Sequence, residues 1–383
     1  MFLALRELRH AKLRYMLISF IMVLIVLLVL FVTALARGLS SDNASSIKQM
    51  DADYYVLQEN SDQRLTRSSI ERSTVKQISQ ALAQDTTVSY ASLGVQMTSI
   101  TKAGSPKKVD STFFAVDTEQ FLTPALVEGK MFGANSADEV IVDRSFTEEG
   151  LQIGDLIEDT STGLQFKIVG FTEGESFSHS PVIHMSFDAW NVLSENRIIH
   201  PAAAGGSQAG EDSIPPITAV AVRGEIKDAD QLQDQVSGIE VITQAEALKG
   251  IPGYKEEQGS LQMMIAFLFI IAAFVLAVFF YVLTIQKIGQ FGVLKAIGAK
   301  TAYLARTLIL QVLLLSVASI GIGIALTYGL SLMLPPSMPF ELTPSLVLIS
   351  SGLFLFVALA GSMLSLYRIS KVDAIEAIGR AAA

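Results

Sequence analysis

The 383-residue sequence contains no cysteine, so disulfide bonds are excluded as a source of stability for any part of it. Histidine is scarce as well, and the four histidines are spread along the chain as His10, His179, His184 and His200. In the stretch "HSPVIH", His179 and His184 are five positions apart, which places their side chains on opposite faces of a strand. No Ser-His-Asp, paired-carboxylate or G-x-S-x-G pattern stands out. We therefore predict neither a metal site nor a catalytic role.

Charged residues are missing from four long blocks of the sequence: Tyr15–Ala36, Gln258–Gln286, Thr307–Phe340 and Leu342–Tyr367. Each block holds the ~20 apolar residues that a helix needs to cross a bilayer. The first block has the basic flank and the small-residue end of a secretory signal, but its apolar run is longer than the ~7–15 residues of a signal peptide. We favour a retained anchor over a cleaved signal.

The basic residues fall in the short segments next to these blocks. The N-terminal arm, the connection after the second block and the C-terminal tail together hold eleven Lys and Arg against three Asp and Glu. Residues 37–257 hold 17 Lys and Arg against 33 Asp and Glu. Basic short loops stay in the cytoplasm. Both termini are therefore predicted on the cytoplasmic side of a bacterial plasma membrane, and the acidic segment on its outer side. No nucleic-acid partner is expected.

The fold class that follows is an α-helical membrane protein with four transmembrane helices and an α+β extracytoplasmic domain between the first two. Residues 69–83 are predicted as a helix, and five short strands at 139–143, 155–159, 166–171, 181–187 and 217–222. The small and polar residues 202–216 indicate a loop. The predicted order is an amphipathic elbow (1–14), the first span (15–36), the external domain (37–257), the second span (258–286), a basic segment (287–306), the third span (307–334), an external loop (335–344), the fourth span (345–367) and a tail (368–383). An alternative for residues 1–14 is a basic anchor that sets the orientation by the positive-inside rule and has no further role.

The basic segment after the second span, "QKIGQFGVLKAIGAKT", has a distant likeness to a phosphate-binding loop. That motif needs four residues between its glycines and a Gly-Lys-Ser/Thr ending. Here five residues separate Gly292 from Gly298, and Ala299 precedes Lys300, so a nucleotide site is excluded. Apolar residues recur every third position instead, which favours a short helix that docks in a partner over an inert basic loop. The predicted docking residues are Lys287, Ile288, Phe291, Leu294, Lys295, Ile297 and Lys300.

Soft and aromatic side chains in and beside the first two spans are suited to a flat hydrophobic ligand. The alternative for each is ordinary helix packing or lipid contact. Arg37 is at the outer end of the first span, where it is not needed for topology and can meet an anionic group, although snorkelling of its charge to the interface is an alternative. The candidate substrate-binding residues are Met22, Phe31, Arg37, Met263, Met264, Phe267 and Tyr281.

Three stretches resemble the FtsX/MacB-like group of ABC-transporter permeases, also called type VII or mechanotransmission systems. They are "ALRELRHAKLRYMLI" at the first span, "TIQKIGQFGVLKAIGAKTAYL" after the second and "YRISKVDAIEAIG" at the C-terminus. The external "EVIVDRSF" and "FKIVGF" are also similar to that group. The stretches around the second span and "KVDAIEAIG" look most like its haem-efflux members.

The resemblance implies a homodimer that binds two copies of a separate ATPase, which alone binds and hydrolyses ATP. It also implies outward removal of haem from the membrane, with haem as the transported substrate and no covalently bound cofactor. Two alternatives remain open. One is a complex that transports nothing and regulates an external cell-wall hydrolase, and the other is export of lipoproteins, peptides or drugs.

Overall fold

The computed structural model describes residues 12–83, 85–133, 135–199, 215–226, 229–335 and 338–370, and the chain divides into two compact units. The helical unit comprises residues 1–39 and 259–383, and the α+β unit comprises residues 40–258. Most of the predicted elbow, most of the tail and residues 202–214 of the predicted loop lie outside the described residues.

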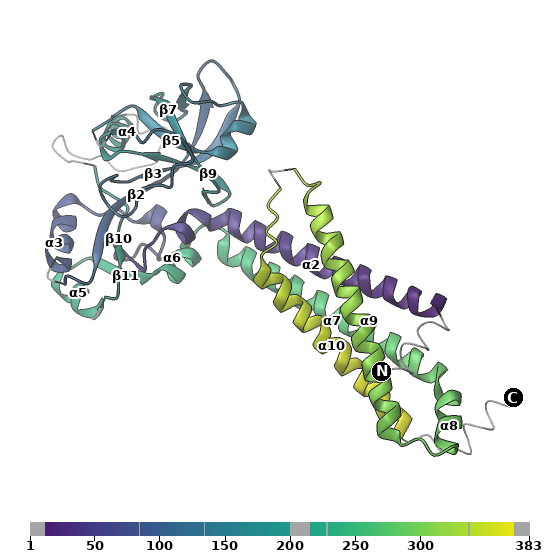
Figure 1. The fold of residues 1–383 in the computed structure, drawn as a ribbon. Helices are drawn as coiled ribbons and strands as arrows, with labels where there is room; N and C mark the ends of the chain where they lie inside the picture. Colours follow the sequence, from purple (N-terminus) through teal and green to yellow (C-terminus); the bar gives the residue numbers. More distant parts are fainter. Residues whose placement is uncertain are drawn as a thin grey trace. The chain divides into compact units, whose positions relative to one another are not determined.

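Four described helices are long and apolar enough to cross a membrane, as predicted. They are α2 (Lys12–Gln49), α7 (Tyr254–Gln286), α9 (Thr301–Ser331) and α10 (Pro344–Ser370) (Figure 1). A short helix, α8 (Ile288–Ala296), follows α7. The helices extend beyond the charge-free blocks, since α2 continues past residue 36 to Gln49 and α9 already begins at Thr301. Polar and charged residues therefore mark the ends of the apolar blocks, but the helices continue through them.

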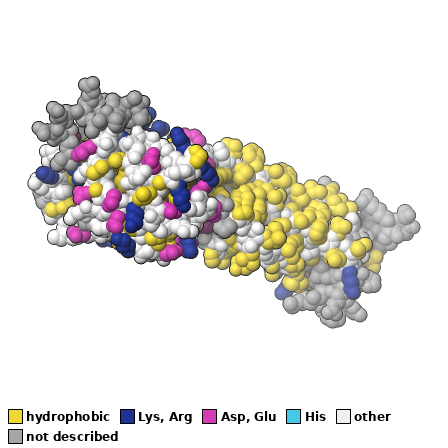
Figure 2. All heavy atoms as spheres, turned by 90° about the horizontal axis from the view of Figure 1, so that it is seen from above, with side chains coloured by type: hydrophobic (Ala, Val, Ile, Leu, Met, Phe, Trp, Pro, Cys, Tyr) yellow, Lys and Arg dark blue, Asp and Glu magenta, His cyan; other side chains and the backbone are white. Residues whose placement is uncertain are grey.

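The core of the helical unit forms where α2, α7, α9 and α10 bring apolar side chains together, and it includes Met22, Leu30, Phe280, Val312 and Phe354. Ser19 and Ser319 form a hydrogen bond of 3.1 Å between α2 and α9, and small polar residues of this kind allow close helix packing in membranes. The face of this unit that Figure 2 shows is predominantly hydrophobic, and many large apolar side chains of its helices are exposed. Such a surface is stable when it faces lipid.

The α+β unit is built on one mixed sheet with the strand order β11-β1-β10-β2-β3-β9-β5-β7-β4, with β6 and β8 paired off this path. The strands are β1 (Tyr54–Gln58), β2 (Ser89–Lys102), β3 (Lys108–Ala115), β4 (Glu128–Gly129), β5 (Glu139–Asp143), β6 (Leu156–Asp159), β7 (Gln165–Thr172), β8 (Ser176–Phe177), β9 (Ser180–Met185), β10 (Ala219–Arg223) and β11 (Ile239–Thr243). All five predicted strands are present, within about two residues of their predicted bounds. The helices are α3 (Arg72–Leu82), which matches the predicted helix, α4 (Phe187–Ile199), α5 (Ala229–Gln235) and α6 (Gln244–Gly250), with 3-10 turns η1 (Leu65–Arg67) and η2 (Arg144–Glu149).

The sheet is packed on both faces by apolar clusters, one of which includes Phe113, Phe166 and Trp190 and another Tyr55, Leu93 and Phe114. This core replaces the disulfides that the sequence cannot form. The unit also contains the end of α2 beyond residue 39 and the start of α7 before residue 259. Both connections of the sheet to the spans are therefore helical.

Candidate functional site

The break between α7 and α8 is the first feature of the candidate site in the helical unit. Helix α7 ends at Gln286, and Lys287 lies between the two helices at the start of α8. Helix α8 ends before Gly298, whose φ of +95° is the left-handed conformation that glycine adopts after a helix. The backbone amide of Ala299 donates to the Leu294 carbonyl at 2.9 Å and closes that end.

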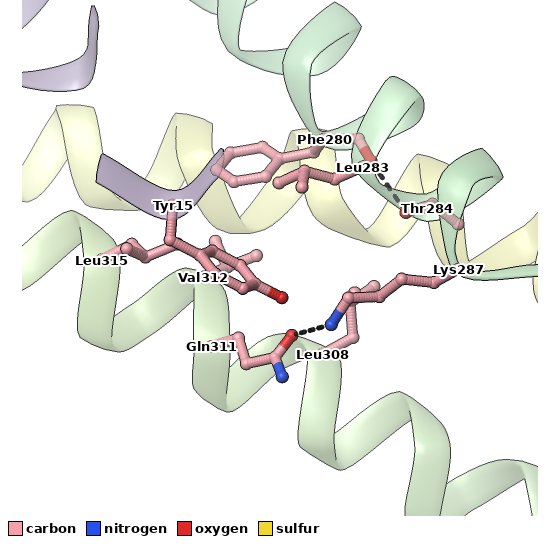
Figure 3. A pocket seen from close by; sticks show the side chains of 9 residues that line it. All are labelled: Tyr15, Phe280, Leu283, Thr284, Lys287, Leu308, Gln311, Val312 and Leu315. Atoms are coloured by element: carbon pink, nitrogen blue, oxygen red, sulfur yellow. Dashed lines mark hydrogen bonds between the residues drawn. The ribbon is translucent and has the colours of Figure 1, made fainter. Parts of the chain in front are cut away.

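Lys287 is buried at this break, where three helices meet (Figure 3). Its Nζ donates to Gln311 Oε1 of α9 at 2.7 Å and lies 5.5 Å from the centroid of the Tyr15 ring of α2. The three side chains border a cavity of about 10 Å³, roughly the space of one water, together with Phe280, Leu283, Thr284, Leu308, Val312 and Leu315. A buried ammonium group is costly unless it has partners. The contacts to Gln311 and Tyr15 therefore hold the break against both neighbouring helices.

Helix α8 has one face turned into the unit and one face turned outward. Phe291 is buried and packs with Leu304 and Leu308 of α9. On the outward face, Val293 is 50% exposed and Ile297, directly after the helix, is 75% exposed.

The predicted docking ridge therefore divides between the two faces of α8. Positions three residues apart step back by about 60° around a helix of 3.6 residues per turn, so Phe291 and Ile297 diverge by about 120°. Phe291 is corrected to a packing residue, and Lys287 likewise, because both are buried within the chain. Leu294 and Lys295 are half-buried, Lys300 is exposed, and the Ile288 side chain lies outside the described set. Gln290, Val293 and Ile297 make up the exposed face.

Beyond the far end of the apolar block in α2, Arg37 pairs with an acid that the sequence alone did not connect to it. Its Nε donates to Glu341 Oε1 at 3.2 Å, and the Glu341 backbone amide donates to the Ala34 carbonyl at 3.1 Å. Gly38 allows this contact, since a Cβ there would meet the Pro339 carbonyl oxygen at 2.3 Å. The Arg37 side chain remains half exposed, so the pair is accessible to a competing anion.

The candidate substrate residues occupy three different environments. Met22 is 1% exposed in the core of the helical unit, so its assignment to ligand contact is corrected to helix packing. The Phe31 ring packs against the Phe340 ring at an interplanar angle of 43°, with centroids 5.3 Å apart. The remaining four residues, Met263, Met264, Phe267 and Tyr281, are exposed on α7.

The α7 candidates do not converge on one point. Tyr281 follows Met263 by 18 positions, which is about 27 Å along a helix. A single bound iron atom can therefore meet the methionine end or the tyrosine end of α7 in one chain, but not both.

Sequence reasoning missed Gln311 and Glu341 as partners. Each had a local signal, because Gln311 is a lone amide in a charge-free block and Glu341 is the acid that separates the third and fourth blocks. Neither signal identifies the side chain that it meets.

Two histidines of the α+β unit contact carboxylates. His184 is buried against Glu175, and His179 lies in a turn between Asp42 and Glu257. Within the residues that the structure describes, no group of three His, Asp or Glu side chains is arranged to hold a metal ion.

Two family models match the chain. The model described as FtsX-like permease C-terminal covers residues 263–374, and the model described as MacB-like periplasmic core domain covers residues 16–239. Together they include the four spans and most of the sheet.

Curated relatives match over nearly the whole length. A Staphylococcus haemolyticus protein, named as the hemin transport system permease HrtB, is 32% identical over 98% of this chain and 99% of its own length. A Staphylococcus epidermidis protein of the same name is 29% identical, with 98% and 99% covered.

Solved structures give a weaker likeness. The periplasmic region of MacB from Actinobacillus actinomycetemcomitans has a TM-score of 0.35 at 9% identity and covers 53% of this chain and 92% of its own. The extracellular domain of the transporter YknZ has a TM-score of 0.33 at 14% identity, with 49% and 98% covered. At such scores the likeness alone establishes no shared fold. The two family models and the full-length relatives show that the chain belongs to the FtsX/MacB-like family of ABC-transporter permeases.

Proposed function

We propose that the chain is the permease subunit of an ATP-driven exporter that removes haem from the bacterial membrane. Its α+β unit faces outward and its termini face the cytoplasm, an orientation supported by the basic short segments and the acidic residues 37–257. Full-length relatives named for hemin transport support the choice of haem. The chain hydrolyses nothing itself, and ATP binds to a separate ATPase subunit.

The observation that carries the ATPase coupling is the division of α8 into a fixed face and an exposed face. Phe291 and Lys287 attach the helix to α9. Gln290, Val293 and Ile297 are available to a groove on the partner. A push on the exposed face therefore reaches α7 and α9 together, instead of being absorbed by a loose loop.

The second span offers the surface for a second copy and for the substrate. Only 17% of the most apolar window of α7 is buried, against 33% to 39% in the other three spans. Its exposed side chains recur at helical spacing: Met263, Phe267, Ile270, Phe274, Val278 and Tyr281. We assign this stripe to the homodimer interface and to lateral entry of haem from lipid. A thioether or a phenolate is a reasonable ligand for haem iron.

Arg37 is the proposed partner of a haem propionate. Its Nε already meets Glu341, so a propionate would share or replace that contact. Arginine suits this role because its guanidinium presents five donors to carboxylates.

The test is transport in proteoliposomes that contain the chain and its ATPase, with haem in the bilayer and an external haem-binding acceptor. ATP-dependent transfer to the acceptor is expected, and none with an ATPase subunit that cannot hydrolyse ATP. If ATP is hydrolysed normally but no haem moves, haem export is refuted. That result would favour the alternative in which the complex regulates an external cell-wall hydrolase.

A further inference from the structure

A two-residue hairpin turn in the α+β unit has an unusual backbone. Strands β8 and β9 pair Phe177 with Ser180, which leaves Ser178 and His179 as the turn. Their φ angles are +52° and +61°. Turns of this type strongly favour Asn-Gly or Asp-Gly, because other residues rarely adopt positive φ. Neither residue here is glycine or asparagine, so the turn keeps a conformational cost that local sequence preference does not explain.

The turn is held between the ends of the two helices that enter this unit. The Ser178 amide donates to the Asn43 carbonyl of α2 at 2.7 Å, and the Ser178 hydroxyl donates to the carbonyl of Pro252, two residues before α7, at 3.2 Å. Helix α2 is itself interrupted here, because Ala44 has non-helical angles of φ −146° and ψ 18°. The turn thus supports a point where α2 bends.

The imidazole of His179 extends this bridge with two ionic contacts. Its Nδ1 lies 3.1 Å from Asp42 Oδ2 on α2, and its Nε2 lies 3.0 Å from Glu257 Oε2 on α7. Asn43 donates to the same Glu257 oxygen at 2.5 Å. Lys48, a nearby cation on α2, donates to the Ser40 carbonyl at 3.0 Å and lies 5.5 Å from the centroid of the Tyr254 ring.

Both contacts require the protonated ring. A neutral imidazole has one N–H and one lone pair, so one of the two carboxylates would then face a lone pair. The imidazolium donates from both nitrogens and satisfies both acids. Although partial burial disfavours the charged form, hydrogen bonds to Asp42 and Glu257 and their negative charges outweigh it and raise the pKa of His179 above its ordinary value.

We propose that His179 is a positioning residue whose imidazolium joins the outer ends of α2 and α7, so that the spacing of these two ends depends on external pH. The geometry of the bridge stands on its own, and only its placement outside the cell rests on the proposed function. Because the pKa is raised on folding, the stabilisation is fully present below the unfolded value of about 6.5 and is lost as pH rises through the folded value. Mild acid therefore holds the ends together, and alkaline conditions release them.

The test is a distance measurement between spin labels in the full-length chain in nanodiscs. The chain has no cysteine, so Ser41→Cys on α2 and Lys255→Cys on α7 give two unique labelling sites. We expect a narrow distance distribution at pH 5.5, and a broader or longer one at pH 9.

Two substitutions at the same position provide matched controls. His179→Gln cannot bridge as a cation and should give the broad distribution at both pH values. His179→Arg stays charged and should give the narrow one at both. The proposal is overturned if the unsubstituted labelled chain shows no pH dependence, or if His179→Gln keeps it. The measurement needs neither haem nor ATPase, so its outcome is independent of the proposed transport.

Discussion

Lys287 Nζ lies 2.7 Å from Gln311 Oε1, and this contact joins the break between α7 and α8 to the first third of α9. Residue 287 is the first position after the second span, where the positive-inside rule alone would leave a lysine exposed. Its burial against Gln311 and Tyr15 makes it part of the structure that would transmit movement from α8. The proposed binding of an ATPase then involves other residues of the segment.

Replacing Lys287 by Met removes the donor to Gln311 Oε1 but keeps a long side chain. We expect a loss of about 1–3 kcal/mol in the free energy of unfolding, since a buried acceptor loses its partner. Thermal unfolding of the chain in nanodiscs measures it.

The double variant Lys287→Met with Gln311→Leu should regain much of that loss, because both polar partners are then gone. Equal stability of the Lys287→Met variant and the unsubstituted chain would show that the contact between Lys287 and Gln311 does not contribute to the free energy of unfolding.

The exposed face of α8 predicts which substitutions prevent assembly with the ATPase. Val293→Asp and Ile297→Asp should abolish co-purification of the partner, because each places a carboxylate on the apolar docking face, while the chain itself stays folded. Val127→Asp, at an exposed valine of the α+β unit, is the matched control and should leave assembly intact.

Phe291→Ala should behave differently from both. It removes a buried ring from its contacts with Leu304 and Leu308 and should cost about 3 kcal/mol of stability. An unchanged unfolding temperature for Phe291→Ala, combined with lost ATPase binding, would show that Phe291 is a docking residue, as the sequence predicted.

The pair of Arg37 and Glu341 predicts opposite effects on haem affinity. Arg37→Ala should weaken binding about tenfold, because one charge-assisted hydrogen bond is worth about 1.5 kcal/mol. Glu341→Gln should strengthen it modestly, because a half-exposed ion pair contributes no more than about 1 kcal/mol and its loss frees the guanidinium. Absorbance titrations with haem measure both, and equal affinity in all three proteins would remove Arg37 from the site.

The acid stability of the α+β unit should depend on Asp159, which is fully buried. Burial opposes its ionisation, but hydrogen bonds from Ser161, Thr98 and Thr162 and the nearby Arg197 charge outweigh this and lower its pKa. A lowered pKa contributes stability above the unfolded value of about 3.9, and that stability is lost as pH falls through the folded value.

Asp159→Asn should therefore cost about 2 kcal/mol at pH 7 and flatten the acid limb of the stability profile. The single tryptophan, Trp190, lies in the core of this unit and reports its unfolding by fluorescence. The control Asp155→Asn weakens a partly exposed pair with Lys102 and keeps a side-chain oxygen that can accept from the Gln152 backbone amide, so it should cost less than about 1 kcal/mol. An acid limb that Asp159→Asn leaves unchanged would contradict the assignment.

Much of the fold follows from local patterns. Charge-free blocks predict the four spans because an isolated charge is expensive in lipid, and "EVIVD" predicts β5 at its observed bounds. The long strand β2 was not predicted, because "SYASLGVQMTSITK" has no strict alternation and obtains its pairing from β3, β6 and β10. Its strand character is a property of the sheet.

The candidate site was less predictable, because its contacts join distant parts of the chain. Arg37 and Glu341 are 304 positions apart, and no local pattern connects them. Whether the Phe291 side chain points into the unit or outward depends on where α9 packs. The spacing of apolar residues along α8 carries no information about the position of α9. Sequence reasoning found the basic segment and the arginine, and the structure identifies what each one contacts.

The most direct test of haem export is the rate of ATP hydrolysis by the purified chain and its ATPase in nanodiscs, titrated with haem while the Soret band is recorded. We expect a saturable rise in hydrolysis with a shifted Soret band, and a higher haem requirement for Arg37→Ala. A hydrolysis rate that stays constant across the titration, with the spectrum of free haem, would contradict it.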